Sequence, residues 1–185
     1  KMAFASALSL GVTSEAEYVD IELADEIGEA PFCAALSRQL PAGVVIKQAK
    51  AYSDKVKALM AVVNMAAYTI KVPPAADIKA AQQSIAAFNQ AEAAIYGKKS
   101  PKGNREIDVK QYIVRDVVLT SLPDYMQLDM DIRITPTGSV KPSGVLSVLV
   151  DGFGLAVRPD AALICRRGLL VQTGSKVLSP LESGA

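Results

Sequence analysis

A strictly alternating stretch near the middle of the chain constrains the fold more than any other feature. Between Tyr125 and Thr135 the apolar residues are separated by single polar ones. One side carries Leu128, Met130, Ile132 and Ile134, and the other carries Asp129, Asp131 and Arg133. A period of two is typical of a strand with one buried face. Because Leu122-Pro123-Asp124 predicts a turn, the stretch Val114 to Leu119 is expected to pair with this strand as a hairpin.

The elements on either side of this hairpin predict the order β-α-β-β-α-β for residues 66–172. A strand is expected from Ala67 to Val72 and another from Ala161 to Val171. Helical spacing predicts one helix over Asp77 to Gln90 and a second from Pro142 to Gly152 or Gly154. This order is that of the split β-α-β, or ferredoxin-like, fold. The predicted fold class is therefore α+β with antiparallel sheets.

Residues 1–54 predict a similar half that lacks its opening strand and helix. Strands are expected from Ala3 to Leu10, Tyr18 to Leu23 and Val44 to Tyr52, with a helix from Ala30 to Leu40. We therefore expect roughly 35–45 further residues before Lys1 in the natural protein, the length of one strand, one helix and their loops. Residues 55–65 are interpreted as a connector with a short helix from Val56 to Asn64, and 173–185 as a flexible tail.

The composition argues against most catalytic chemistry. The chain has no histidine, which removes the commonest general base and zinc ligand. Its two cysteines, Cys33 and Cys165, are too few for a thiolate cage and are predicted to be buried thiols. No nucleophile–base pair can be named, so we expect neither an enzyme nor a cofactor. No apolar run is long enough to span a membrane, and a cytoplasmic protein is expected.

A basic excursion at 93–113 is the strongest candidate for a binding surface. With a net charge of +1 for the whole chain, an electrostatic partner requires a local patch such as this one. Five basic residues against Glu106 and Asp108 give the stretch Gly97 to Lys110 a net charge of +3. Such side chains can follow a phosphate backbone, and Tyr96 and Tyr112 could stack on bases. The alternative is a solvated hairpin arm. The basic residues are Lys98, Lys99, Lys102, Arg105 and Lys110.

Three smaller groups of charged residues are weaker candidates. Arg166 and Arg167 are expected on opposite faces of a strand, one of them paired with Asp129 or Asp131, and a phosphate site is the alternative. The two aspartates could serve acid–base or Mg²⁺ chemistry, but a solvent-facing strand explains them more simply. The third group is expected to cap or pair locally, or to contact a partner. It consists of Ser14, Glu15 and Glu17.

Several stretches together resemble a known bacterial family. They are Leu10-Gly-Val-Thr-Ser-Glu-Ala-Glu-Tyr-Val-Asp-Ile-Glu-Leu23, Leu59-Met-Ala-Val-Val-Asn64, Lys102-Gly-Asn-Arg-Glu-Ile-Asp-Val-Lys110, Gly138-Ser-Val-Lys-Pro142 and Ile164-Cys-Arg-Arg-Gly-Leu-Leu170. In these stretches the chain resembles the radical-SAM-linked domain of unknown function, which is fused to or encoded beside a radical SAM protein. The resemblance implies a further strand and helix before Lys1 and an accessory role in RNA modification. The chain lacks the Cys-x3-Cys-x2-Cys motif of a radical SAM enzyme.

Two hypotheses of function follow, and the sequence leaves the oligomeric state open. The first is a non-catalytic accessory module that binds RNA, such as tRNA, for a radical SAM partner through the basic excursion. The second is a protein-interaction module that docks on the radical SAM protein without contacting nucleic acid. In the second hypothesis the apolar surface is formed by Leu59, Met60 and Val63. Charge reversal at Lys98, Lys99 and Lys102 separates the two, because it abolishes only RNA binding.

Overall fold

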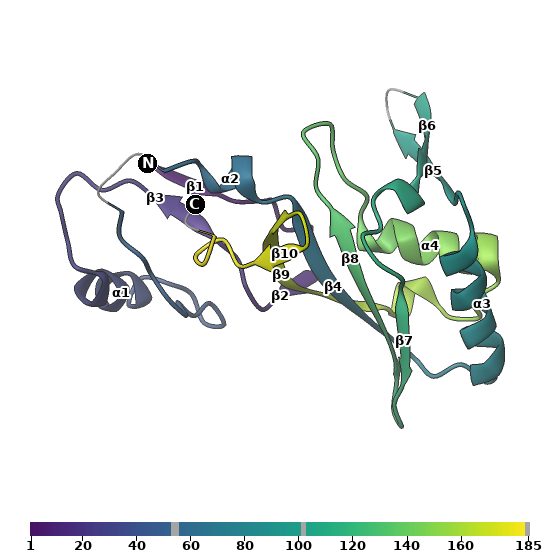
Figure 1. The fold of residues 1–185 in the computed structure, drawn as a ribbon. Helices are drawn as coiled ribbons and strands as arrows, with labels where there is room; N and C mark the ends of the chain where they lie inside the picture. The colour runs from purple at the N-terminus through teal and green to yellow at the C-terminus, as the bar shows by residue number, and fades with distance from the viewer. Residues whose placement is uncertain (53–55, 101–102, 184–185) are drawn as a thin grey trace.

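The computed structural model describes residues 1–52, 56–100 and 103–183, and it describes no side chains between 98 and 105 (Figure 1). The strands are β1 (Met2–Phe4), β2 (Val12–Ser14), β3 (Val19–Ile21), β4 (Met65–Val72), β5 (Ile95–Ser100), β6 (Gly103–Asp108), β7 (Val118–Ser121), β8 (Met126–Arg133), β9 (Leu163–Thr173) and β10 (Lys176–Leu178). The helices are α1 (Glu29–Ser37), α2 (Leu59–Val62), α3 (Ile78–Gln90) and α4 (Pro142–Phe153), with 3-10 turns η1 (Val109–Gln111) and η2 (Pro159–Ala161).

A six-stranded sheet organises the molecule. Five of its strands follow the order β10-β9-β4-β8-β7, and every neighbouring pair in that order is antiparallel. The sixth strand, β2, runs parallel to β9. Two further pairs, β1 with β3 and β5 with β6, are separate antiparallel ribbons. The prediction of an α+β chain with antiparallel sheets is therefore confirmed at this level.

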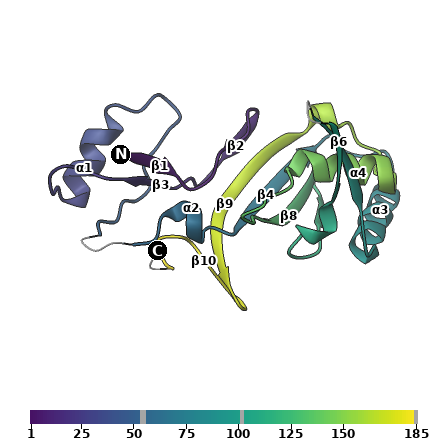
Figure 2. The ribbon, with the colours of Figure 1, turned by 90° about the horizontal axis from the view of Figure 1, so that it is seen from above.

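The alternating stretch forms β8 and supplies one wall of the main core. Met126, Leu128, Met130 and Ile132 are each at most 1% exposed. Helices α3 and α4 cover this face of the sheet (Figures 1 and 2). Asp77 caps α3 by accepting from the backbone N–H groups of Lys79 and Ala80. Pro142 opens α4, and Gly154 ends it with a φ of 70°, a conformation that favours glycine.

A second, smaller core lies further along the same sheet. Ala66 of β4 and Leu169 of β9 contact Leu59, Val63 and Ala5 there. Tyr68 packs against both cores and so connects their apolar side chains. The N-terminal third contributes little to either, because Ala5 is the one buried residue among 1–52. That third is therefore held by local contacts with the sheet rather than by a core of its own.

Four predicted elements differ from the structure. The strand predicted over 44–52 is absent: this segment has no regular structure, and Val44 and Val45 are 53% and 79% exposed. The predicted helix over Val56 to Asn64 is reduced to α2. Residues 176–178, within the predicted tail, form β10 and pair with β9. The predicted first strand ends at Phe4, and β2 is a strand that the sequence did not predict.

No helix among the described residues combines the length and the apolar character that crossing a membrane requires.

Candidate functional site

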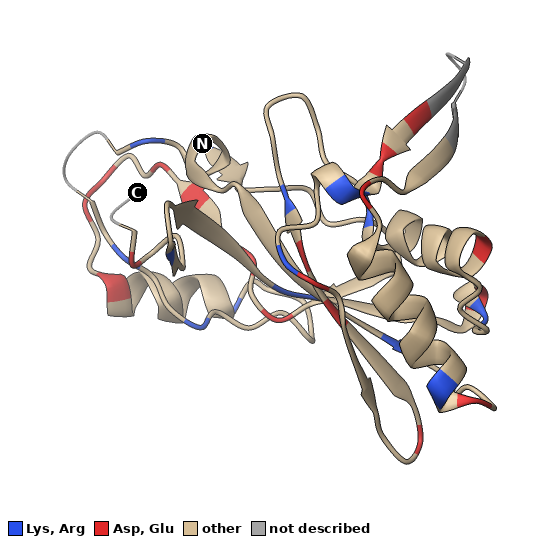
Figure 3. Ribbon diagram, turned by 45° about the vertical axis from the view of Figure 1, so that its right-hand side comes forward, with Lys and Arg blue, Asp and Glu red and all other residues tan. Residues whose placement is uncertain are grey.

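The predicted basic excursion is a β-hairpin that stands out from the body of the molecule (Figures 1 and 3). In its backbone register Lys98 pairs with Arg105, and Lys99 pairs with Asn104. The side chains of these residues lie outside the described part of the structure, and so does Lys102 as a whole. The hairpin backbone thus places Lys98 and Arg105 opposite each other on one projecting arm.

The base of the hairpin is fixed firmly to the helices. The ring of Tyr96 lies against Gly144 of α4, where an added Cβ would come within 3.1 Å of the ring. Val109, just after β6, is fully buried. Asp108 Oδ1 accepts from the backbone N–H groups of Ala94, 2.9 Å away, and Lys110, 3.1 Å away. The arm therefore projects from a rigid anchor.

Lys110 belongs to this anchor rather than to a binding surface. Its ammonium Nζ donates to the backbone carbonyls of Phe88 and Asn89, both at 3.0 Å. These carbonyls lie at the C-terminal end of α3, where a cation satisfies free acceptors and the helix dipole. The same Nζ lies 4.8 Å from the centre of the Phe88 ring. The role of Lys110 as a phosphate contact is therefore not supported by its surroundings.

Tyr96 and Tyr112 are also packed against the main core, and both are half-buried. Their rings are covered by protein on at least one side, and the prediction that they stack on bases does not fit this packing. Of the residues predicted to form this surface, four remain candidates, and their side chains lie outside the described part of the structure: Lys98, Lys99, Lys102 and Arg105.

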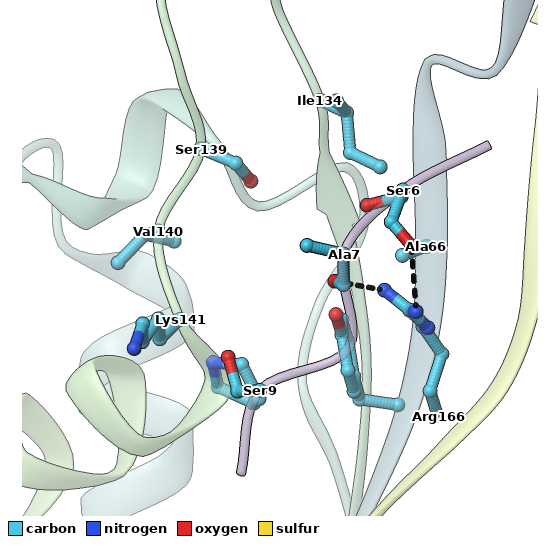
Figure 4. A pocket seen from close by; sticks show the side chains of 11 residues that line it. Ser6, Ala7, Ser9, Ala66, Ile134, Ser139, Val140, Lys141 and Arg166 are labelled. Atoms are coloured by element: carbon cyan, nitrogen blue, oxygen red, sulfur yellow. Dashed lines mark hydrogen bonds between the residues drawn. The ribbon is translucent and has the colours of Figure 1, made fainter. Parts of the chain in front are cut away.

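Arg166 is the arginine that forms the predicted kind of structural ion pair, but its partner is Glu17, whose side chain is 29% exposed. Its Nε donates to Glu17 Oε1 at 2.7 Å and its Nη2 to Glu17 Oε2 at 2.6 Å. Arg166 is 1% exposed. Its guanidinium also donates to the backbone carbonyls of Ala7 and Ser6 (Figure 4). Burial alone would lower the pKa of Arg166, but hydrogen bonding and charge from Glu17 and Tyr68 outweigh burial and raise the pKa.

Residues next to Arg166 and Glu17 also join the N-terminal segment to β9. Arg167 Nε lies 2.8 Å from Glu15 Oε2, in a pair that is about half exposed on both sides. The Ser14 hydroxyl lies within hydrogen-bond distance of Glu17 and of the Arg166 carbonyl. Of the two expectations for Ser14, Glu15 and Glu17, local pairing describes their contacts in this structure.

The prediction that one of the two arginines pairs with Asp129 or Asp131 was wrong. Asp131 pairs with Arg115 at 2.6 Å, and Asp129 accepts from Thr69 and Gln127. Asp131 is only 7% exposed, so the interpretation of a fully solvent-facing strand was also wrong at this position. In the sheet, Arg166 of β9 lies opposite Tyr68 of β4, and Asp129 of β8 lies opposite Thr69 of β4. Because Tyr68 and Thr69 are consecutive residues of one strand, their side chains point to opposite faces of the sheet. Arg166 and Asp129 therefore lie on opposite faces and cannot pair.

The predicted docking residues are only partly accessible. Leu59 and Val63 are 7% and 6% exposed and belong to the smaller core. Met60, by contrast, is 69% exposed. The apolar surface predicted from these three residues is therefore wrong for two of them.

A cavity of about 150 Å³ lies where the N-terminal segment crosses the sheet (Figure 4). Four separate stretches surround it: the segment after β1, strand β4, the segment leading into α4, and β9. Their lining residues are Ser6, Ala7, Ser9, Ala66, Tyr68, Ile134, Ser139, Val140, Lys141, Pro142 and Arg166. Sequence reasoning missed this site, although Lys141-Pro142 at a helix start without acidic residues was a readable signal.

Both cysteines are free thiols, and both are half-buried rather than buried as predicted. Among the described residues, no three cysteine, aspartate or glutamate side chains come together as a metal site.

With the geometry established, comparison with known proteins gives the family. The profile of a family described as "Uncharacterized protein conserved in bacteria (DUF2344)" matches residues 1–142. The chain belongs to this DUF2344 family. The matched region includes the hairpin, the Glu17 side of the ion pair and the start of α4. No curated protein and no solved structure matches the chain.

The anchor role of Lys110 gives a testable prediction for this DUF2344 chain. Replacing it by Met removes one donor from each of the carbonyls of Phe88 and Asn89, of which Phe88 keeps the Ala91 N–H, and we expect the free energy of unfolding to fall by about 1–2 kcal/mol. Chemical denaturation measures this. Lys79→Met, at the exposed start of α3, is the matched control and should change stability little. Equal stability of both variants would contradict the anchor role.

Proposed function

We propose that this protein is a non-catalytic accessory module that binds RNA through the arm formed by β5 and β6. The observation that carries the proposal is the arm itself, a hairpin that projects from a rigid base (Figure 3). The sequence of its stretch 98–105 contains Lys98, Lys99, Lys102 and Arg105. A narrow, positively charged projection can reach phosphates in a groove or a loop of structured RNA.

The open face of the sheet is a poorer candidate for the RNA contact. Domains that bind RNA on a four-stranded sheet stack bases on aromatic side chains there. On the face of β8 that lies away from α3 and α4, Gln127, Asp129, Asp131 and Arg133 alternate with the core residues. None of these is aromatic, and two carboxylates would repel phosphates. The arm is therefore favoured over the sheet.

Contacts made by the arm are expected to be mainly electrostatic. Because Tyr96 and Tyr112 are packed against the core, base stacking contributes little in this proposal. Three or four phosphate contacts predict that log affinity falls with log salt concentration with a slope of roughly −2 to −3. Sequence preference should be weak, since phosphates carry no base information.

The wider setting of the proposal rests on the sequence resemblance. The partner would be a radical SAM protein, the substrate a tRNA-like RNA and the location the cytoplasm. We also propose that residues 65–173 form a ferredoxin-like unit. This assignment is supported by the order β4-α3-β7-β8-α4-β9 along the chain and β9-β4-β8-β7 across the sheet.

Charge reversal tests the RNA proposal. Changing Lys98, Lys99 and Lys102 to Glu should weaken binding of bulk tRNA about tenfold or more and flatten its salt dependence. Fluorescence anisotropy over a salt series measures both. The control reverses three exposed lysines elsewhere, Lys47, Lys57 and Lys176, and has the same net charge. The proposal fails if the unaltered protein does not bind tRNA at low salt, or if both variants lose binding equally.

Exposed apolar residues in the N-terminal third favour protein docking as a second candidate function. Phe4 and Met60 are 55% and 69% exposed, while their chain neighbours Ala5 and Leu59 share the smaller core. Strand β1 and helix α2 therefore meet at the smaller core, and each exposes one large apolar side chain, Phe4 and Met60, to solvent. We propose the radical SAM protein as the occupant of this surface, on the same resemblance as above.

The double variant Phe4→Ser, Met60→Ser tests this docking surface. Its affinity for the proposed radical SAM partner, in purified form, should fall about tenfold or more, because exposed apolar anchors are lost. Titration calorimetry measures the affinity. Val118→Ser, at an exposed position on β7, is the control. Unchanged affinity of the double variant would rule out docking at this surface.

A further inference from the structure

Strand β7 leaves one edge of the six-stranded sheet open. It is the last strand in the order β10-β9-β4-β8-β7, so it is paired on its β8 side (Figure 1). Leu122 donates its N–H to the Tyr125 carbonyl across the turn, and in an antiparallel ladder bonded positions alternate with positions that face away. The backbone N–H and C=O groups of Leu119 and Ser121 therefore point away from β8. Among the described residues, no group bonds to these four.

The side chain of Asn89 supports this direction and closes one end of the open edge. Its Nδ2 donates to the Val117 carbonyl at 2.9 Å, and its Oδ1 accepts from the Val117 N–H at 3.0 Å. Val117 is two residues before Leu119, so the backbone groups of both residues point the same way. Asn89 thus takes the place of a neighbouring strand at Val117. Within the described part of the chain, Leu119 and Ser121 have no such substitute.

Strand β7 also lacks most of the features that keep strand edges from pairing with other chains. Edges are commonly protected by lysine, by proline or by a bulge. The strand itself, Val118–Ser121, contains no charged residue and no proline. A bulge does precede it, because residues 115–117 lie opposite a single residue of β8. The open edge is therefore short, with the bulge at one end and the turn before β8 at the other.

This edge is complementary to a second copy of itself. When two β7 strands pair antiparallel about a two-fold axis at Thr120, Leu119 of each copy lies opposite Ser121 of the other. That register uses every outward backbone group of both residues and forms four hydrogen bonds. On the face of the sheet away from α3 and α4, Thr120 meets its own copy, and Val118 lies opposite Leu122. Such threonine and apolar pairs across strands are favourable.

Helix α3, which lies beside β7, presents a nearly uncharged surface to the same side. Asn89 contacts the edge at Val117, and Lys79, Gln82 and Ala86 precede Asn89 at helical spacing. Gln82 and Ala86 are exposed, and Lys79 is the one charged residue of α3. A two-fold axis perpendicular to the sheet keeps both copies of α3 on one face, where small or uncharged side chains allow them to approach.

We propose that this protein forms a weak homodimer in which β7 pairs antiparallel with β7 of a second copy and joins the two sheets into one. A four-residue edge buries less than the roughly 1,200 Å² of a stable interface, so we expect a dissociation constant of about 10–100 µM. Asp116 of one copy lies opposite Asp124 of the other just beyond the pairing, so salt should tighten association. The edge shares no residue with the arm or with Phe4 and Met60, and the dimer stands independently of both.

Sedimentation equilibrium at roughly 1–300 µM protein tests the dimer. Ser121→Pro removes an outward N–H from each copy and leaves the bonds to β8 intact, so the variant should fold and its dissociation constant should rise about tenfold or more. Ser121→Ala keeps the N–H and is the matched control. The proposal is overturned if the unaltered protein stays monomeric, which leaves the edge to a strand of another protein. Equal association of the two Ser121 variants also overturns it.

Opposite charges at position 120 test the two-fold register, whether or not Ser121→Pro folds. Thr120 is exposed, and in this register it faces Thr120 of the second copy. Thr120→Lys and Thr120→Glu should each associate about tenfold more weakly than the unaltered protein, because like charges lie opposite each other. An equimolar mixture of the two should recover association, because opposite charges then meet. A mixture that associates no better than the separate variants overturns the proposal.

Discussion

The bidentate contact between Arg166 and Glu17 joins two parts of the chain that are 149 residues apart in sequence. Burying a guanidinium such as that of Arg166 costs several kcal/mol, and the cost is offset only by near-ideal ion-pair geometry and additional acceptors. Both conditions are met, because two parallel hydrogen bonds link the charges and the carbonyls of Ala7 and Ser6 accept further N–H groups. Removal of either partner would leave an unbalanced charge against the sheet.

The N-terminal third depends on this contact because it has so little buried apolar surface. Parallel pairing of β2 with β9 and the small core around Ala5 are its other attachments to the sheet. The ion pair also fixes the course of residues 6–9 across the sheet and so forms one wall of the cavity. The Arg166 side chain therefore links the fold of the N-terminal segment to the shape of the cavity.

The periodic spacing of apolar residues predicted the central strand and helices well, because the elements that pack against one another there all have such spacing. Strand β8 and helices α3 and α4 bury regular apolar stripes against one another, and their caps follow from Asp77, Pro142 and Gly154. The strand predicted at 44–52 failed for the opposite reason. Its Val-rich composition favours a strand, but a strand needs a hydrogen-bonded neighbour, and none of the described strands lies beside it.

Charged residues were harder to interpret than apolar ones. In the sequence, a lysine such as Lys110 can equally contact a phosphate or donate to the last carbonyls of a distant helix. Only the folded positions of Phe88 and Asn89 decide between the two. Likewise, alternation placed Arg166 and Arg167 on opposite faces, but the acidic partner depended on an unpredicted parallel pairing of β2 with β9. Long-range contacts of this kind leave no periodic signal in the sequence.

The most direct test of this account is amide hydrogen exchange on Arg166→Met, with Arg167→Met as control. If the buried pair holds the N-terminal segment, amides that bond across this region, such as those of Ala5 and Glu15, should exchange much faster in Arg166→Met, whereas β8 amides keep their protection. The control should resemble the unaltered protein, because its ion pair is half exposed. Glu17→Gln should repeat the effect in a milder form. Equal protection of Ala5 and Glu15 in both arginine variants would contradict the account.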